Sequence, residues 1–200
     1  MPILFQSSGF LIQAKFKDNE NYLGLHENVW PLNLDLEKNK KYGKYLDDNF
    51  FMAIQDNNKA DLCTDISFIT DYYQSCVEDK INVDLLFCLT NMKLPNDLNP
   101  TLIKKIVNDS MFIGYDYAYN EYDYYSALFS DIYTKRISKL MDIKLNKFGL
   151  LETEEEIIEF SKRRKELIKL SNDPIAEFES GNFCFYKLWV LEPDFIIELQ

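Results

Sequence analysis

The sequence predicts a single α+β domain in which helices pack on a mixed or antiparallel sheet. Hydrophobic residues make up 46% of the 200 residues and charged residues 28%, a composition typical of a globular chain with a sizeable core. Segments with strand-like alternation and segments with helical spacing both occur. No fixed-period repeat and no Gly/Ser-rich linker divides the chain, so residues 1–200 are assigned to one domain. Residues 1–95 are a candidate for a semi-separate N-terminal layer.

The first half of the chain is expected to supply mainly strands. Residues 10–17 alternate apolar and polar side chains, and the short segments NFFMAIQDNN (49–58) and TDISFITDYY (64–73) look like two further strands. The continuous apolar run INVDLLFCLTNM (81–92) fits either a central strand or a buried helix, and the pattern does not separate the two.

A helix followed by a strand is expected just after the middle of the chain. Asn99 can cap a helix whose first residue is Pro100, because proline suits the first helical position. The segment SMFIGYDY (110–117) then reads as a strand that ends at Gly114 or soon after it.

The last third of the chain predicts two helices and a final strand. Apolar residues recur at helical spacing over 137–148, with Gly149 as a C-terminal stop. Thr153 and Glu156 form a capping box at the start of the clearest helix, because each side chain can bond an amide of the first turn. The segment NFCFYKLWVLEPD (182–194) is the last strand, with a proline closing it.

The chain is strongly acidic, with 33 Asp and Glu residues against 22 Lys and Arg and a formal net charge of −11. Such a field repels phosphate backbones and anionic lipids and attracts basic partners. Neither nucleic acid nor a membrane is therefore expected as a partner. The N-terminus lacks the basic leader of a secretory signal, and no segment approaches the ~18 apolar residues of a transmembrane helix. We expect a cytoplasmic protein.

No catalytic, cofactor-binding or metal-binding residue is predicted, and the chain is not expected to be an enzyme. The only histidine, His26, lies in no nucleophile motif, and glycine-rich phosphate loops are missing. The cysteines form no C-x-x-C pair, and we expect them to be reduced structural residues. They are Cys63, Cys76, Cys88 and Cys184.

Charged runs have simpler explanations than catalysis. The pair Asp47–Asp48 favours a turn, and Glu154–Glu156 favours the solvated first turn of a capped helix. The basic run 162–165 favours a solvated helix face, on which Glu159 and Arg163 can form an ion pair because they are four residues apart.

Two segments combine tyrosines and acids without a single base. The first lies between Lys105 and Lys135 and includes IGYDYAYNEYDYYSALF (113–129), which holds six tyrosines and three acids, and the second lies between Lys59 and Lys80. Tyrosine gives a large, rigid contact area at interfaces, and carboxylates around it steer a basic partner into place. The alternative is that several of these tyrosines belong to the core. The predicted partner-binding residues are Asp116, Tyr117, Tyr119, Glu121, Tyr122, Asp123 and Tyr124.

The order of short motifs in the second half resembles a group of bacterial immunity proteins from polymorphic-toxin systems. The matching residues are Gly114-Tyr115-Asp116 with Ala118, Ser126 with Leu128, and Leu145-Asn146 with Gly149-Leu150. The resemblance spans roughly residues 113–190 and departs after Ala118, where Tyr119-Asn120 stands in place of an acid. It implies a non-enzymatic inhibitor that neutralises a cognate toxin in bacterial competition by tight stoichiometric binding.

Two other classes of function stay open. One is a non-enzymatic scaffold or regulatory subunit, for which self-association would be the sign. The other is a hydrolase in which paired carboxylates such as Asp116 and Asp123 act as acid and base or bind a divalent cation.

Overall fold

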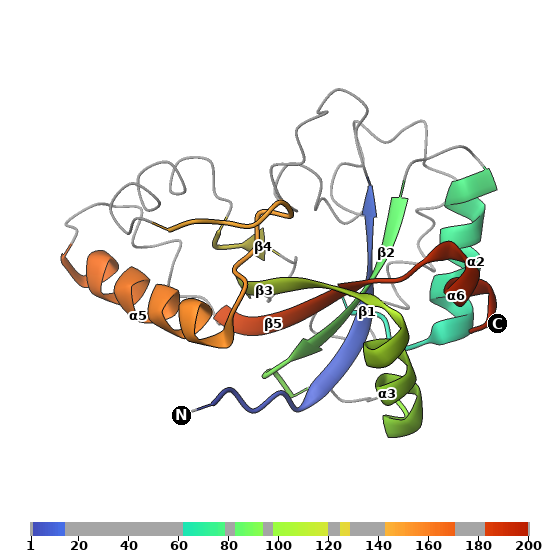
Figure 1. Ribbon diagram of the computed structural model, residues 1–200, viewed down its shortest axis with the longest axis horizontal. Helices are drawn as coiled ribbons and strands as arrows, with labels where there is room; N and C mark the ends of the chain where they lie inside the picture. The colour runs from blue at the N-terminus through green and yellow to red at the C-terminus, as the bar shows by residue number, and fades with distance from the viewer. Residues whose placement is uncertain are drawn as a thin grey trace, which may run out of the picture.

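The computed structural model describes residues 2–14, 62–78, 83–93, 98–119, 125–128, 143–170 and 183–199. Helices and strands both contribute, which confirms the α+β class (Figure 1). In chain order the elements are β1 (Ser7–Ala14), α2 (Ile66–Glu78), β2 (Val83–Thr90), α3 (Pro100–Asp109), β3 (Met111–Tyr119), β4 (Tyr125–Ser126), α5 (Glu154–Leu170), β5 (Phe183–Val190) and α6 (Pro193–Ile197).

The strands form one sheet in the order β1-β2-β5-β3-β4, and every neighbouring pair is antiparallel. The last strand of the chain, β5, lies at the centre between β2 and β3. It therefore joins strands from the first half of the chain to strands from the second half in a single ladder.

An aromatic row crosses four strands on one face of the sheet. Phe10 lies directly opposite Phe87, Phe87 opposite Trp189, and Trp189 opposite Phe112, so the four side chains share a face. Their ring centroids are 5.7, 5.6 and 5.3 Å apart in that order. Offset aromatic pairs at such distances add to the stability that area burial provides.

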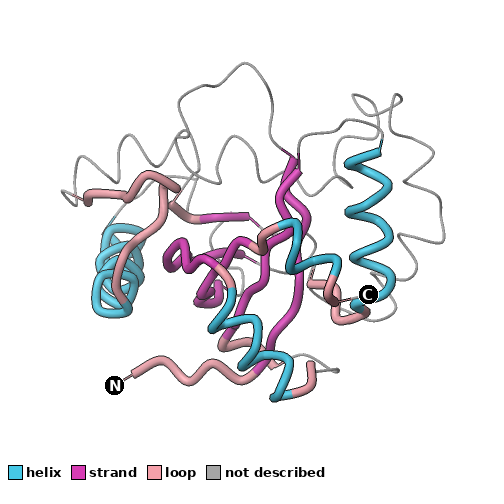
Figure 2. Tube along the Cα trace, turned by 45° about the vertical axis from the view of Figure 1, so that its right-hand side comes forward, coloured by secondary structure: helices cyan, strands magenta, loops and turns pink. Residues whose placement is uncertain are grey.

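Helices α2, α3 and α6 cover the buried part of this row. Ile69 of α2, Ile106 of α3 and Phe195 of α6 belong to the same buried cluster as Phe87 and Trp189. Figures 1 and 2 both show these three helices at one end of the sheet. The other end of β3 and β5 is covered by α5 instead.

Helix α5 packs on β3 and belongs to a second buried cluster. Ile157 and Phe160 are the buried residues of its first turns, and the Phe160 ring meets Tyr117 edge-on at 6.3 Å. On the sheet, Tyr117 stacks against Phe183 at 5.2 Å. Each end of the sheet thus has its own helical cover.

Local signals for helix ends are confirmed. The Asn99 side chain accepts a hydrogen bond of 2.8 Å from the amide of Thr101 at the start of α3. The capping box of α5 forms in both directions, with the Thr153 hydroxyl bonded to the Glu156 amide at 3.2 Å and the Glu156 carboxylate bonded to the Thr153 amide at 2.9 Å. Strands were also correctly expected near 10–17 and in 182–194, and 81–92 contains a strand rather than a helix.

Three expectations are wrong. Segment 64–73 is not a strand but the first part of α2, because Ile66, Ile69 and Tyr73 repeat at helical spacing and pack on the core. Residues 143–148 form no helix, and their apolar side chains instead pack, partly buried, against the second buried cluster. Pro193 does not simply close the last strand, since it begins α6.

Other expectations lie outside the described residues: His26, Asp47–Asp48, the strand at 49–58 and the helical spacing at 137–142. The side chain of Cys76 also lies outside them. The remaining cysteines, Cys63, Cys88 and Cys184, are reduced thiols, as expected. Burial raises the pKa of each of these thiols and keeps it protonated at neutral pH.

Candidate interaction surface

Two of the predicted partner-binding residues are buried, so their assignment to an exposed face is wrong. Asp116 is 0% exposed and Tyr117 is 2% exposed. The reason is that β3 does not end near Gly114 but continues to Tyr119, with β5 on one side and β4 on the other. Asp116 lies directly opposite Tyr186, which is itself fully buried.

The buried carboxyl group of Asp116 has a structural role. One of its oxygens accepts a hydrogen bond of 2.7 Å from the backbone amide of Tyr117. A polar group at 0% exposure depends on such bonds, because burial without a hydrogen bond costs free energy. Tyr119 lies in β3, but its side chain and all of Glu121, Tyr122, Asp123 and Tyr124 lie outside the described residues. Their role as partner contacts stays a prediction.

The second base-free segment does not extend the first one into a single face. Helix α2, which carries most of the second segment, packs on β1 and β2 at one side of the sheet. The described end of the first segment is β4, at the opposite edge. The part of the first segment in β4 therefore lies at the opposite edge of the sheet from α2.

The motif residues that suggested immunity proteins meet at the outer edge of β3. Asn146 is the link: its side-chain amide donates to the carbonyl of Ile113 at 2.8 Å. Its side-chain oxygen accepts from the amides of Phe148 at 2.9 Å and Leu150 at 3.1 Å. One asparagine thus holds the Leu145–Leu150 turn closed and fastens it to β3.

Glycine is required where this turn crosses β3. Gly114 has φ +139°, and a Cβ placed on it would lie 2.7 Å from the Leu150 Cβ and 2.7 Å from the Leu151 carbonyl oxygen. Next to it, Tyr115 and Leu151 form a two-way backbone bridge with bonds of 2.8 and 3.1 Å. Gly149, with φ +69°, allows the turn to reverse.

The Ser126 motif completes the same edge. Ser126 pairs with Ala118, and the amide of Ala127 donates to the carbonyl of Tyr117 at 2.8 Å. The second and third parts of the motif therefore cover the outer edge of β3, on which the first part lies and where unpaired backbone groups would otherwise invite association with another strand. The motif has a structural role in this fold, so partner contacts must be sought elsewhere.

An exposed acidic surface lies on α2 and α6, which both views show side by side (Figures 1 and 2). We call it the α2–α6 surface, comprising residues 65–78 and 192–198. Residues 62–78 and 191–199 contain no Lys or Arg. Two apolar side chains are also exposed there, Val77 at 44% and Ile197 at 64%. The exposed acids are Asp65, Asp71, Glu78, Glu192, Asp194 and Glu198.

Helix α3 borders this surface and supplies a cation to it. Lys105 pairs with Glu198 at 3.0 Å, and its ammonium also lies 5.0 Å from the centre of the Phe195 ring. Both partners of this ion pair are largely exposed, so it contributes little stability.

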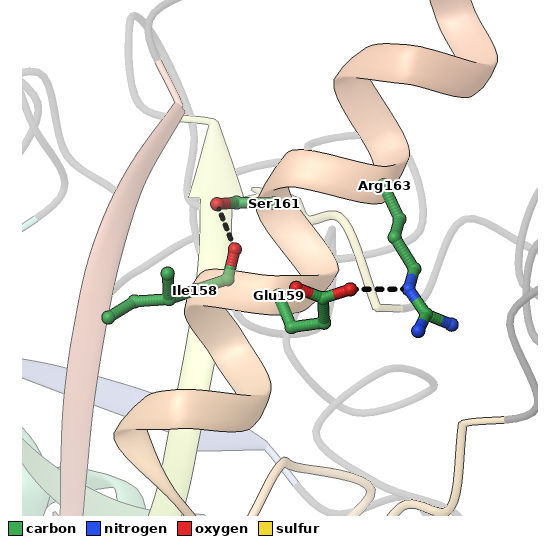
Figure 3. A network of polar contacts seen from close by, with 4 residues as sticks. All are labelled: Ile158, Glu159, Ser161 and Arg163. Atoms are coloured by element: carbon green, nitrogen blue, oxygen red, sulfur yellow. Dashed lines mark hydrogen bonds and ion pairs between the residues drawn. The ribbon is translucent and has the colours of Figure 1, made fainter.

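Helix α5 carries a mixed charge pattern instead. Figure 3 shows the expected ion pair between Arg163 and Glu159, at 2.6 Å, on the exposed face. The basic run is only partly solvated, however, because Arg164 is 5% exposed and its guanidinium lies 4.0 Å from the centre of the Phe183 ring. Arg164 therefore lies on the buried side of α5 together with Ile157 and Phe160.

A groove of about 420 Å³ runs beside α5 and has an apolar floor of Ile143, Leu151 and Phe160. Of the acids along it, Glu156 bonds the amides of Glu152 and Thr153, and Glu159 is paired with Arg163. Among the described residues, no group of three or more His, Cys, Asp or Glu side chains is placed to hold a metal ion.

Comparison with protein families, curated proteins and solved structures found no match to this chain. Within the described residues, no helix has the length and apolar character needed to cross a membrane.

Proposed function

We propose that this chain is a cytoplasmic immunity protein that neutralises a basic cognate toxin by tight stoichiometric binding, without catalysis. The observation that supports the proposal is the α2–α6 surface, where six exposed carboxylates face solvent in two segments that contain no base. The resemblance of the motif residues to immunity proteins is a second, weaker support.

The charge and the exposed apolar area of this surface both suit a basic protein partner. Exposed carboxylates gathered in one region raise the association rate with a basic surface, because they steer it into the right orientation, and they repel acidic competitors. Ile197 and Val77 add apolar area among the acids, and a binding surface needs such area because charge pairs at a solvated rim add little affinity. An acidic inhibitor can also occupy a groove that a nucleic-acid-directed toxin uses for phosphates. Tyr119 and residues 121–124 remain proposed as additional contacts.

The experiment is co-expression with the protein encoded immediately next to this one on the chromosome. Host survival and co-purification of a one-to-one complex are the expected results. A surface variant, Asp71→Lys with Glu78→Lys and Asp194→Lys, should slow association by about 10-fold or more at low salt.

The matched control reverses three exposed acids near or on α5: Glu152→Lys, Glu155→Lys and Glu166→Lys. It changes the net charge by the same amount, so it measures the effect of overall charge alone. Equal loss in the two variants would remove the α2–α6 surface from the proposal. A harmless neighbour that forms no complex would count against immunity itself, and sedimentation of the chain alone would then test for a self-associating scaffold.

A further inference from the structure

A bulge in β3 brings two aromatic side chains to the same face of the sheet. Phe112 lies opposite Trp189 and Gly114 lies opposite Leu188, so the residue between them, Ile113, is inserted without a partner. In a regular strand, residues three apart point to opposite faces. Because of the insertion, Phe112 and Tyr115 lie together, with ring centroids 5.4 Å apart. Bulges of this kind re-aim side chains and are common beside functional sites.

The two rings gathered by the bulge and the ring of Trp189 on β5 together surround a lysine. The ammonium of Lys187 lies 5.6 Å from the centre of the Phe112 ring, 5.4 Å from Tyr115 and 5.6 Å from Trp189. Among the residues that the structure describes, no carboxylate lies within ion-pairing distance of this ammonium. Its only partners there are π faces, in a chain where acids outnumber bases 33 to 22.

The aromatic row is buried along most of its length and exposed only at the end where this site lies. Phe10 and Phe87 are 0% exposed and Trp189 is 3% exposed, whereas Phe112, the last ring of the row, is 39% exposed. Met111 next to it is 41% exposed. An apolar side chain fixed by buried neighbours loses little rotamer freedom on binding, which is the property of an interface anchor.

We infer that Phe112 and Lys187 form the centre of the toxin-binding surface, with Phe112 as the apolar anchor and Lys187 as the partner of a carboxylate on the toxin. This inference rests on the proposed function. Trp189 belongs to the same buried cluster as Phe195 of α6 and lies four residues before that helix begins.

The chemistry of the site selects an anionic group on a protein. A cation from the partner has no place there, because Lys187 already lies over the three rings that would hold it. A nucleic acid would bring many phosphates toward a chain of net charge −11 and its acidic helices. A single carboxylate on an otherwise basic toxin is attracted to Lys187 without that repulsion.

The test measures the dissociation constant and both rate constants for purified wild-type and variant proteins with the co-purified toxin, inactivated for handling. Phe112→Ala should weaken binding by about 30-fold or more, mainly through faster dissociation. Lys187→Met should weaken it by about 10-fold, and Lys187→Arg by less than about 3-fold, since arginine keeps the charge and the ring contact. Leu4→Ala is the control, because Leu4 is 75% exposed in the segment before β1, and it should bind like wild type.

Folding effects are separated from binding effects by recording the melting temperature of each variant and by including Phe112→Leu. This variant keeps apolar bulk and should retain most of the affinity. If wild type binds the toxin but Phe112→Ala and Lys187→Met bind equally well, the inference fails and the immunity function stands. If wild type forms no complex, both fail. Binding of single-stranded RNA that Lys187→Met abolishes would show a phosphate site and overturn the inference.

Discussion

Replacing Gly114 by alanine should destabilise the protein by about 4 kcal/mol, because two independent penalties act at this position. A φ of +139° lies in a region that is essentially restricted to glycine, and forcing another residue into it costs on the order of 1–3 kcal/mol. The new Cβ would also lie 2.7 Å from both the Leu150 Cβ and the Leu151 carbonyl oxygen. Neither atom is the end of a flexible side chain, so relief requires a shift of the turn, which typically costs about 1–3 kcal/mol.

Urea unfolding followed by far-UV circular dichroism measures this loss as a shift in the transition midpoint. The matched control is Gly9→Ala in β1, where a Cβ would lie 2.9 Å from the Leu62 Cβ and 3.3 Å from the Cys63 carbonyl oxygen. Gly9 has no positive φ, so only the packing penalty applies, and we expect a loss of about 1–2 kcal/mol.

A second arm tests whether the penalty arises from the turn at 145–150. In an Asn146→Ala background the turn loses its bond to the Ile113 carbonyl and can move away from β3. Gly114→Ala should then cost about 1 kcal/mol less than in the wild-type background. A loss below about 1 kcal/mol for Gly114→Ala alone, or one equal to that of Gly9→Ala, would refute the role assigned to Gly114.

Three further predictions concern a thiol, a helix cap and a buried acid. Burial, and to a lesser extent the nearby charge of Asp65, raises the pKa of Cys63 from 9.0 to about 11. Above pH 9 the unfolded chain therefore loses this proton before the folded one does, and stability should fall by about 2–3 kcal/mol between pH 9 and 11 relative to the Cys63→Ala variant. Thr153→Ala should cost about 1 kcal/mol in thermal unfolding through loss of the helix cap. Asp116→Lys should abolish cooperative unfolding, whereas Asp116→Asn should fold with a lowered melting temperature; if Asp116→Lys were as stable as wild type, the burial of Asp116 would be in doubt.

Much of the fold could be predicted because its signals are local. Each of these signals depends on residues that are close together in the sequence. They are the Asn99 cap, the capping box at Thr153 and the alternation of β1. Helix α2 was missed because Ile, Thr, Phe and Tyr dominate it, and these residues favour strands unless a core selects the helical face. In α2 that core is the row of Phe10 and Phe87.

The candidate site was harder to predict because it depends on register. Nothing local distinguishes a buried Asp116 from an exposed one, since its environment comes from Tyr186, seventy residues later in the chain. The bulge that places Phe112 beside Tyr115 is equally invisible, although a glycine within a strand pattern is a known hint of one. The six acids of the α2–α6 surface can each be found in the sequence, but only the fold brings the two helices together.

The residues that make the fold and those proposed to bind the partner are different sets. Gly114, Asn146 and Leu150 are fixed by backbone geometry and by one another, so a change at any of them is felt through stability. Exposed side chains on α2 and α6 contact little of the core, and exchanges at such positions usually change stability by less than about 0.5 kcal/mol. Phe112 packs on Trp189 but keeps 39% of its surface exposed. A chain built in this way can acquire a new partner by exchanging surface residues while the edge of β3 stays closed. Variants selected for binding to a different toxin should therefore carry their substitutions on α2, α6 and around Phe112, and a set concentrated at Gly114, Asn146 and Leu150 would contradict this separation.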